Sequence, residues 1–122
     1  MLARHAVVVD DDADGREALA QLLEAQGYTV RQAENGRVAL DLIAERLPCL
    51  LLLDLEMPLM SGWEVLAWIR LDPALGEMVI VVVSAAASPP PDVALVRKPC
   101  QVDHLLDTIR ASHEQRAKRV VS

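Results

Sequence analysis

The feature that most constrains the fold is a set of short apolar runs, each of which ends abruptly at a polar residue. The run at 49–53 (Cys-Leu-Leu-Leu-Leu) stops at Asp54, and the run at 78–83 (Met-Val-Ile-Val-Val-Val) stops at Ser84. An uninterrupted apolar run of this length is typical of a strand covered on both faces, as in parallel sheets. The two runs therefore predict central strands of a sheet that has helices on both sides.

Strand-like and helix-like segments alternate along the rest of the chain. We expect strands at 5–9, 28–33, 49–53, 78–83 and 93–96. Three helices between them are expected to begin at the capping residues Asp14, Asn35 and Ser61. A closing helix should follow the last strand, because apolar residues recur there at helical spacing, namely Val102, Leu105, Leu106 and Ile109.

This alternation predicts an α/β fold, a doubly wound five-stranded parallel sheet in which ligands bind beyond the carboxyl ends of the strands. No linker or internal repeat divides the 122 residues. We therefore expect a single domain over residues 1–122, in which 116–122 is either a tail or the start of a linker.

Charge and hydropathy exclude several kinds of partner. The formal net charge is −6 at pH 7, which argues against direct binding to nucleic acid or to an anionic membrane surface. No apolar run approaches the ~20 residues that span a bilayer, and the N-terminus lacks the layout of a signal peptide. A cytoplasmic location is expected.

Cysteines and aromatic residues are few. Cys49 and Cys100 lie far apart, without the spacing of metal ligands, so we interpret them as reduced thiols. The aromatic residues are Tyr28, Trp63 and Trp68. The core must therefore consist of Leu, Val, Ile and Ala, and the two tryptophans are expected to be packing residues rather than ligand contacts.

The polar residues at the strand ends form the most informative pattern. Asp10 and Asp11 follow the first strand, Asp54 the third, Ser84 the fourth and Lys98 the fifth. Parallel strands bring these residues to one edge of the sheet, where neighbouring carboxylates repel one another unless a cation lies between them. Carboxylate oxygens suit a hard ion such as Mg²⁺. The alternative is that the acidic residues after the first strand form only a turn and a helix cap.

At these positions the chain resembles the receiver domains of two-component response regulators. The similar segments are Val-Val-Val-Asp-Asp-Asp at 7–12, Leu-Leu-Asp-Leu-Glu-Met-Pro-Leu-Met-Ser-Gly at 52–62, Val-Val-Val-Ser-Ala at 81–85, and Lys-Pro at 98–99. The resemblance covers nearly the whole chain. It implies the flavodoxin-like strand order 2-1-3-4-5 and a cis peptide bond between Lys98 and Pro99.

The resemblance also implies roles for the acidic residues. Asp54 would be the phosphoacceptor, activated with Mg²⁺ or Mn²⁺. Asp11, Asp54 and the backbone carbonyl of Glu56 would hold the metal ion, and Asp10 would assist. In the family the position of Glu56 influences dephosphorylation, so we expect this solvent-facing residue to tune the lifetime of the phosphoryl group.

Two further residues complete the implied chemistry. Lys98 would pair with a phosphoryl oxygen, and Ser84 would donate a hydrogen bond to another and move toward it. The family carries an aromatic residue where this chain has Leu95, and a phenylalanine where it has Cys100. These two differences affect the transmission of the signal rather than the phosphorylation chemistry.

The segment between Ser84 and Lys98 departs most from the family. It holds only residues 85–97, too few for an average helix of ~11 residues followed by a strand of ~5. It also contains Pro89–Pro91, which cannot lie inside a helix. We therefore expect the fourth helix of the family to be missing or reduced, and the output surface to be altered.

Three functions are compatible with these observations. The first is a phosphoaccepting receiver, a signalling domain rather than an enzyme, which takes its phosphoryl group from a histidine kinase or a histidine phosphotransfer protein and switches an unknown downstream partner. The second is a receiver-like interaction module that phosphorylation does not regulate. The third is a small Mg²⁺-dependent phosphohydrolase, but the chain lacks a cap domain to enclose a substrate.

Overall fold

The computed structural model describes residues 4–85 and 93–121. Its parallel sheet has five strands in the order β2-β1-β3-β4-β5. The strands are β1 (His5–Val9), β2 (Thr29–Ala33), β3 (Leu50–Leu53), β4 (Val79–Ser84) and β5 (Ala94–Arg97). The helices are α1 (Ala13–Ala25), α2 (Gly36–Glu45), α3 (Gly62–Leu71) and α4 (Val102–Val121), with a 3₁₀ helix η1 (Pro73–Glu77). The predicted fold class and strand order are confirmed.

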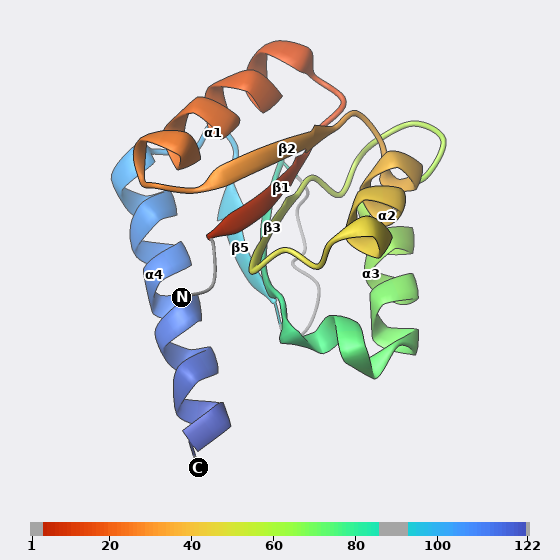
Figure 1. Cartoon of the computed structure of the whole chain (residues 1–122). Helices are drawn as coiled ribbons and strands as arrows, with labels where there is room; N and C mark the ends of the chain where they lie inside the picture. The colour runs from red at the N-terminus through yellow and green to blue at the C-terminus, as the bar shows by residue number, and fades with distance from the viewer. Residues whose placement is uncertain (1–3, 86–92, 122) are drawn as a thin grey trace.

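Helices cover both faces of the sheet, with α1 and α4 on one side and α2 and α3 on the other (Figure 1). The alternation of side chains along each strand divides the core into two apolar clusters. In the four-leucine strand β3, Leu51 and Leu53 face α2 and α3, whereas Leu50 and Leu52 face α1 and α4. All four are almost completely buried, which explains why this strand carries no polar residue.

The register brings the carboxyl ends of the central strands to one level. Val9 of β1 lies opposite Leu53 of β3, and Leu53 lies opposite Val82 of β4. The residues that follow these strands therefore leave the sheet at the same edge. This edge is where the sequence places its acidic residues.

The connection between β4 and β5 is short, because β4 ends at Ser84 and β5 begins at Ala94. Four α-helices lie among the described residues, and none of these lies between β4 and β5, which is consistent with the predicted reduction of the family's fourth helix. The label α4 therefore denotes the closing helix. The segment Pro89–Pro91 lies outside the described residues.

Helix capping follows the sequence at two of three predicted positions. The side chains of Asn35 and Ser61 cap α2 and α3, as predicted. The prediction for α1 was wrong: its cap is Asp12, whose carboxylate accepts a hydrogen bond from the backbone N–H of Gly15 at 3.3 Å. Asp14 lies instead in the first turn, where a negative charge is favourable.

Two predictions of burial were also wrong. Val102 was expected to face inward but is 51% exposed, because it lies at the very start of α4. Trp63 and Trp68 were expected to be packing residues, yet both lie on the exposed side of α3. The 3₁₀ helix η1 was not predicted; it begins at Pro73, directly after Asp72, which is the C-cap of α3.

The closing helix is longer than the apolar pattern indicated. Leu105 and Ile109 are buried against the sheet, as predicted, and the backbone stays helical through Val121. Arg116 forms an ion pair of 2.8 Å with Glu77 of η1, which ties the distal part of α4 to the rest of the molecule. No helix among the described residues is long and apolar enough to cross a membrane.

Candidate functional site

The carboxyl edge of the sheet gathers four of the predicted site residues. Asp10 follows β1, Asp54 follows β3, Ser84 ends β4 and Lys98 follows β5. Backbone hydrogen bonds continue beyond the strands: the N–H of Asp54 donates to the carbonyl of Val9 at 3.0 Å, and the N–H of Lys98 donates to the carbonyl of Ser84 at 3.1 Å. The parallel sheet therefore fixes the backbone from which these side chains project.

The ammonium group of Lys98 joins two buried carboxylates. Its Nζ lies 2.8 Å from Oδ2 of Asp10 and 3.3 Å from Oδ2 of Asp54. The two aspartates are only 2% and 7% exposed. Burial acts to lower the pKa of Lys98, but the hydrogen bond to Asp10 and the charge of Asp54 outweigh it, and the pKa is raised. The lysine is therefore held in its charged form.

Three carboxylates converge at this edge. Oxygen atoms of Asp10, Asp11 and Asp54 all lie within 4.8 Å of one another. Asp11 is exposed, so an ion can reach the cluster from solvent, whereas the other two are buried. Hard divalent cations such as Mg²⁺ prefer this all-oxygen donor set. The residues present therefore fit the predicted metal ion.

The turn after β1 is both a helix cap and part of the site. Oδ1 of Asp10 accepts a hydrogen bond from the N–H of Asp12 at 2.9 Å, and Asp12 in turn caps α1. The capping interpretation thus holds for Asp12, while Asp10 and Asp11 belong to the carboxylate cluster. The sequence did not predict a role for Arg16 at this site. Its Nη1 donates a hydrogen bond to the backbone carbonyl of Asp10 at 2.8 Å and so fixes the turn after β1.

The loop after β3 wraps around the side chain of Asp54. The N–H of Glu56 donates to Oδ1 of Asp54 at 3.3 Å, and the Glu56 side chain is exposed, as predicted. At the end of this loop, the N–H of Gly62 donates to the carbonyl of Leu55 at 2.9 Å. A Cβ on Gly62 would collide with the backbone carbonyl of Asp54. Glycine is therefore required where α3 meets the loop that carries Asp54.

The remaining predicted residues lie beside the cluster. Ser84 is completely buried at the end of β4. Leu95 lies on β5 opposite Val82 and packs, half-buried, against the apolar cluster of α2 and α3. The Lys98–Pro99 peptide bond is cis, as predicted.

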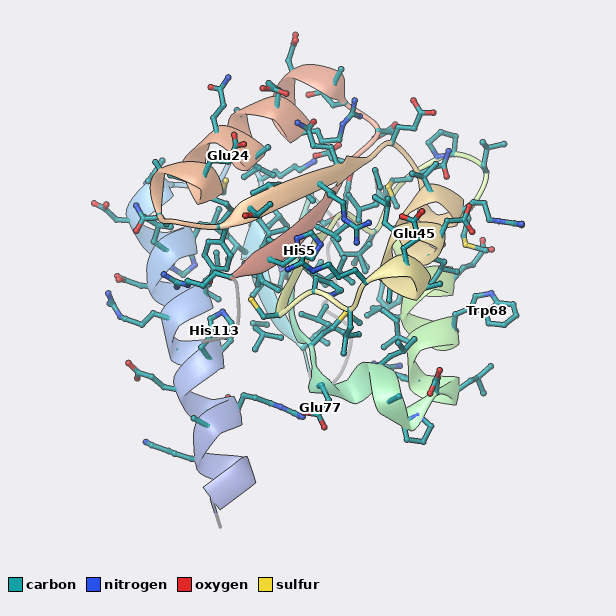
Figure 2. The ribbon with its side chains drawn as sticks, viewed as in Figure 1. His5, Glu24, Glu45, Trp68, Glu77 and His113 are labelled. Atoms are coloured by element: carbon teal, nitrogen blue, oxygen red, sulfur yellow. The ribbon has the colours of Figure 1, made fainter. Side chains whose placement is uncertain are left out.

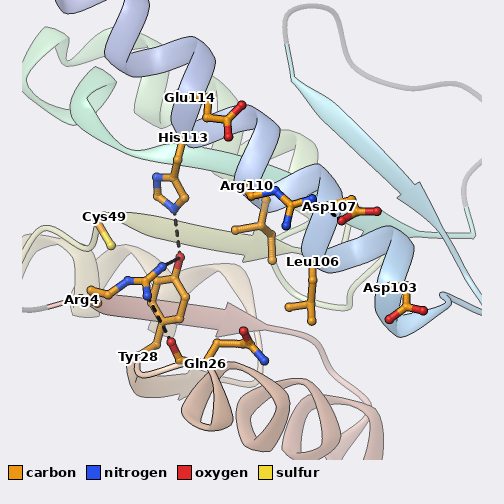
Figure 3. A pocket seen from close by; sticks show the side chains of 11 residues that line it. Arg4, Gln26, Tyr28, Cys49, Asp103, Leu106, Asp107, Arg110, His113 and Glu114 are labelled. Carbon is orange, nitrogen blue, oxygen red and sulfur yellow. Dashed lines mark hydrogen bonds and ion pairs between the residues drawn. The ribbon is translucent and has the colours of Figure 1, made fainter.

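A groove of about 820 Å³ lies at the opposite end of the sheet, between α4 and the residues that precede the strands (Figure 3). Within it, Tyr28 shares a hydrogen bond of 3.0 Å with Nε2 of His113, and the guanidinium of Arg4 lies 4.5 Å from the centre of the Tyr28 ring. Cys49 lines the groove and is a free thiol, as is Cys100. These contacts tie α4 to the amino ends of the strands, far from the carboxylate cluster.

Comparison with known proteins agrees with the fold. Residues 6–110 match the sequence profile of the response regulator receiver domain. The chain is 30% identical to the polar-differentiation response regulator DivK of Brucella anthropi over 118 residues, which cover 90% of this chain and 96% of DivK.

Solved structures are similar over almost the whole chain. The CheY-like response regulator receiver domain protein of Methanospirillum hungatei has a TM-score of 0.84 at 27% identity and covers 97% of this chain and 99% of its own. The response regulator TrrA of Thermotoga maritima, solved in complex with Mg²⁺-BeF, has a TM-score of 0.79 at 30% identity. That match covers 89% of this chain and 98% of TrrA.

An open parallel sheet with an acidic cluster and a lysine at its carboxyl edge is the arrangement expected of a receiver domain. This chain belongs to the response regulator receiver domain family. Receiver domains act in two-component signalling, where they interact with histidine kinases and downstream effectors, and phosphorylation and Mg²⁺ are typical of the family.

Proposed function

We propose that this chain is a phosphoacceptor receiver, phosphorylated on Asp54 by a histidine kinase or a histidine phosphotransfer protein. The observation that carries the proposal is the convergence of three carboxylates and one ammonium group at the carboxyl edge of the sheet. A purely structural turn has no need of two buried carboxylates joined to a lysine, because burying charged groups costs free energy. The similarity to TrrA, which was solved with Mg²⁺-BeF, supports the same interpretation.

In the proposed reaction, a carboxylate oxygen of Asp54 attacks the phosphorus of a phosphohistidine. A new O–P bond forms, the P–N bond breaks, and its electron pair returns to the imidazole of the donor. Asp11, Asp54 and the backbone carbonyl of Glu56 would hold Mg²⁺ or Mn²⁺, with Asp10 assisting. The ion would supply positive charge that offsets the charge on the phosphoryl oxygens.

Lys98 and Ser84 would bind the phosphoryl group once it is transferred. The ammonium of Lys98 already lies 3.3 Å from a carboxylate oxygen of Asp54, and it would pair with a phosphoryl oxygen there. Ser84 would donate its hydroxyl to another oxygen. Movement of Ser84, with Leu95 adjusting on the neighbouring strand, would switch a partner surface, and Glu56 would tune the lifetime of the phosphoryl group.

We further propose that residues 1–122 form one receiver domain in the cytoplasm and that 116–122, helical as far as Val121, form a tail or the start of a linker. The chain would act as a signalling domain that promotes its own phosphorylation and dephosphorylation, not as an enzyme for an external substrate. Its downstream partner would be a protein rather than nucleic acid or a membrane, consistent with the net charge of −6.

One observation favours a second candidate, a receiver-like interaction module that phosphorylation does not regulate. The fourth helix of the family is reduced, and Leu95 takes the place of the aromatic residue on β5. Both features belong to the route by which a signal would leave the acid cluster. Such a module would keep the fold and bind its partner equally well with and without phosphate.

Intact-mass spectrometry after incubation with acetyl phosphate and Mg²⁺ tests the proposal. We expect a single phosphoryl adduct on the wild-type chain and none on Asp54→Asn or in the absence of metal. Asp41→Asn, an exposed carboxylate on α2, is the matched control and should leave the adduct unchanged. An adduct that persists in Asp54→Asn would exclude Asp54 as the acceptor. Absence of both the adduct and beryllofluoride binding would favour the unregulated module.

A further inference from the structure

The side chain of Arg16 reaches from α1 back to the turn that carries the carboxylate cluster. Its Nη1 donates a partly buried hydrogen bond to the backbone carbonyl of Asp10 at 2.8 Å. That carbonyl belongs to the peptide unit that joins Asp10 to Asp11, and a peptide unit is planar. Asp11 is the exposed member of the cluster. The hydrogen bond from Arg16 therefore sets the orientation of the backbone from which the Asp11 side chain projects.

Asp10 is held at each of its polar atoms. Its N–H donates to the carbonyl of Ala33 at 3.1 Å. Of its two carboxylate oxygens, Oδ1 accepts a hydrogen bond from the N–H of Asp12 at 2.9 Å, and Oδ2 pairs with Nζ of Lys98 at 2.8 Å. The backbone carbonyl is the remaining polar atom, and it is the one that Arg16 binds. Without Arg16, the peptide unit after Asp10 would lose its hydrogen bond to the rest of the protein on the carbonyl side.

A chain of side-chain hydrogen bonds holds Arg16 in turn. Its Nε donates to Oε1 of Gln32 on β2 at 3.2 Å. Nε2 of Gln32 donates to Oε2 of Glu17 at 2.8 Å, and Nε2 of Gln21 donates to Oε1 of the same carboxylate at 3.2 Å. A guanidinium is planar, with its donors in a fixed fork. Binding of Nε by Gln32 therefore also directs Nη1 toward the acidic turn.

The alternation of side chains along β2 explains why Gln32 is the residue that meets Arg16. Successive side chains of a strand point to opposite faces of the sheet. Arg31 points to the face of α2, where it forms an ion pair of 3.0 Å with Glu45. Figure 2 shows Glu45 on α2, well apart from α1. Gln32 points to the other face, where α1 presents Arg16 and Glu17.

We infer that Arg16 is a positioning residue for the metal site: it orients the peptide unit between Asp10 and Asp11 so that Asp11 can bind Mg²⁺ or Mn²⁺. Gln32 supports Arg16 from β2. This role rests on the proposed function, because it concerns the same carboxylate cluster. A guanidinium has no acceptor atom and cannot itself bind a cation. Groups that orient metal ligands in this indirect way typically change metal affinity about 10–100-fold when they are removed.

The charge of Arg16 and its hydrogen bond have opposite effects on metal binding. A positive charge beside the carboxylate cluster repels a cation, so removal of the charge alone would tighten metal binding. Removal of the hydrogen bond to Asp10 releases the peptide unit and weakens metal binding. We expect the loss of the hydrogen bond to dominate, because it acts on the ligand backbone directly, whereas salt screens the charge. The sign of the change therefore separates positioning from simple electrostatics.

Titration with Mn²⁺, followed by the electron paramagnetic resonance signal of the free ion, measures metal affinity without any need for phosphorylation. We expect Arg16→Met to weaken Mn²⁺ binding about tenfold, at the low end of the range for such groups. Gln32→Met removes the support of Arg16 without changing any charge and should weaken binding about threefold. Arg37→Met is the matched control, because it removes the same charge from an exposed position on α2. Its affinity should stay within about twofold of the wild type, since exposed charges are screened.

The double variant shows whether Gln32 acts through Arg16. Residues in one hydrogen-bond network have non-additive effects. In a chain that already carries Arg16→Met, the further change Gln32→Met should therefore leave Mn²⁺ affinity almost unchanged. Circular dichroism should show that each variant is folded. Gln32→Met keeps the test open should Arg16→Met unfold, because Gln32 is exposed.

The possible results separate this role from the proposed function. Binding of Mn²⁺ by the wild-type chain together with unchanged or tighter binding in Arg16→Met would overturn the positioning role and leave the proposed function standing. The role is also overturned if Gln32→Met weakens binding equally with and without Arg16. A wild-type chain that binds no Mn²⁺ would overturn the proposed metal site and the role of Arg16 together.

Discussion

The Nζ of Lys98 lies 2.8 Å from Oδ2 of Asp10, although the two residues stand 88 positions apart in the sequence. The ion pair connects the residue that follows the last strand, β5, to the residue that follows the first strand, β1. Because it also reaches Asp54 at 3.3 Å, Lys98 is the cation that balances the buried carboxylates of this protein. Its raised pKa means that its contribution to stability is complete at neutral pH and is lost only as the pH rises through the folded-state value.

Replacement of Lys98 by Met should therefore destabilise the chain. We expect a loss of about 1–2 kcal/mol in the free energy of unfolding at neutral pH, because two buried carboxylates lose their charged partner while partial solvent access limits the cost. Urea denaturation followed by circular dichroism measures the change. Lys118→Met, at an exposed position on α4, should be within about 0.5 kcal/mol of the wild type. Equal stability of the two variants would contradict the balancing role of Lys98.

Magnesium should stabilise the folded chain through the carboxylate cluster. An ion that binds only the folded state raises the unfolding free energy by about 2.7 kcal/mol at a hundred times its dissociation constant. We expect Mg²⁺ to raise the melting temperature of the wild type and of Asp14→Asn, but to have little effect on Asp11→Asn. Differential scanning calorimetry with and without the ion makes the comparison. An unchanged Mg²⁺ effect in Asp11→Asn would remove Asp11 from the ligand set.

Substitution of Gly62 by Ala should be strongly destabilising. The added Cβ collides with the backbone carbonyl of Asp54, which cannot move without shifting the end of β3. We expect a cost of at least about 2–3 kcal/mol, the upper part of the range for overpacking. Gly76→Ala is the matched control, because a Cβ at that position meets nothing within 4 Å. Chemical denaturation of both variants decides whether the close approach at Gly62 matters.

Stability should fall as the pH decreases below neutrality. Burial lowers the pKa of His5, and the nearby charges of Arg31 and Arg46 lower it further. Burial, together with the charge of Arg4, also lowers the pKa of His113. The contributions of both histidines are therefore present above the unfolded-state value of about 6.5 and are lost as the pH falls through the lower folded-state values.

The contacts of His5 show why its neutral form is favoured. Its Nδ1 lies 3.2 Å from the carbonyl oxygen of Thr29, and its Nε2 accepts a hydrogen bond of 3.0 Å from Arg31. A second proton would abolish the bond from Arg31 and place two positive charges together. Urea unfolding between about pH 7.5 and 5.5 should show declining stability, less steeply in His113→Gln. Constant or rising stability over this pH interval would contradict the lowered pKa values of His5 and His113.

Local sequence determined the elements and the residue types of the site. The uninterrupted leucines of β3 predicted a strand buried on both faces, and the aspartate that follows them predicted where a polar group leaves the sheet. Both predictions depend on short-range properties, namely the period of a strand and the cost of burying a carboxylate, so neighbouring residues suffice to make them.

Contacts between distant segments were settled by the tertiary structure. The hydrogen bond from Arg16 to the carbonyl of Asp10 was not predicted, because a long charged side chain on a helix is usually solvated. The position of the cap of α1 was misjudged for a related reason: Asp12 and Asp14 are equally good capping residues, and the path of the chain after β1 decides between them.

The two tryptophans mark the limit of inference from the sequence. They were expected to be packing residues rather than ligand contacts, yet Trp63 and Trp68 lie on the exposed side of α3. By itself, then, the sequence determined the strands, the helices and the acidic edge of the sheet. Only the tertiary structure decided that Trp63 and Trp68 stay exposed while Val65, Leu66 and Ile69 of the same helix pack into the core, because the exposure of a side chain depends on which distant elements pack over its helix.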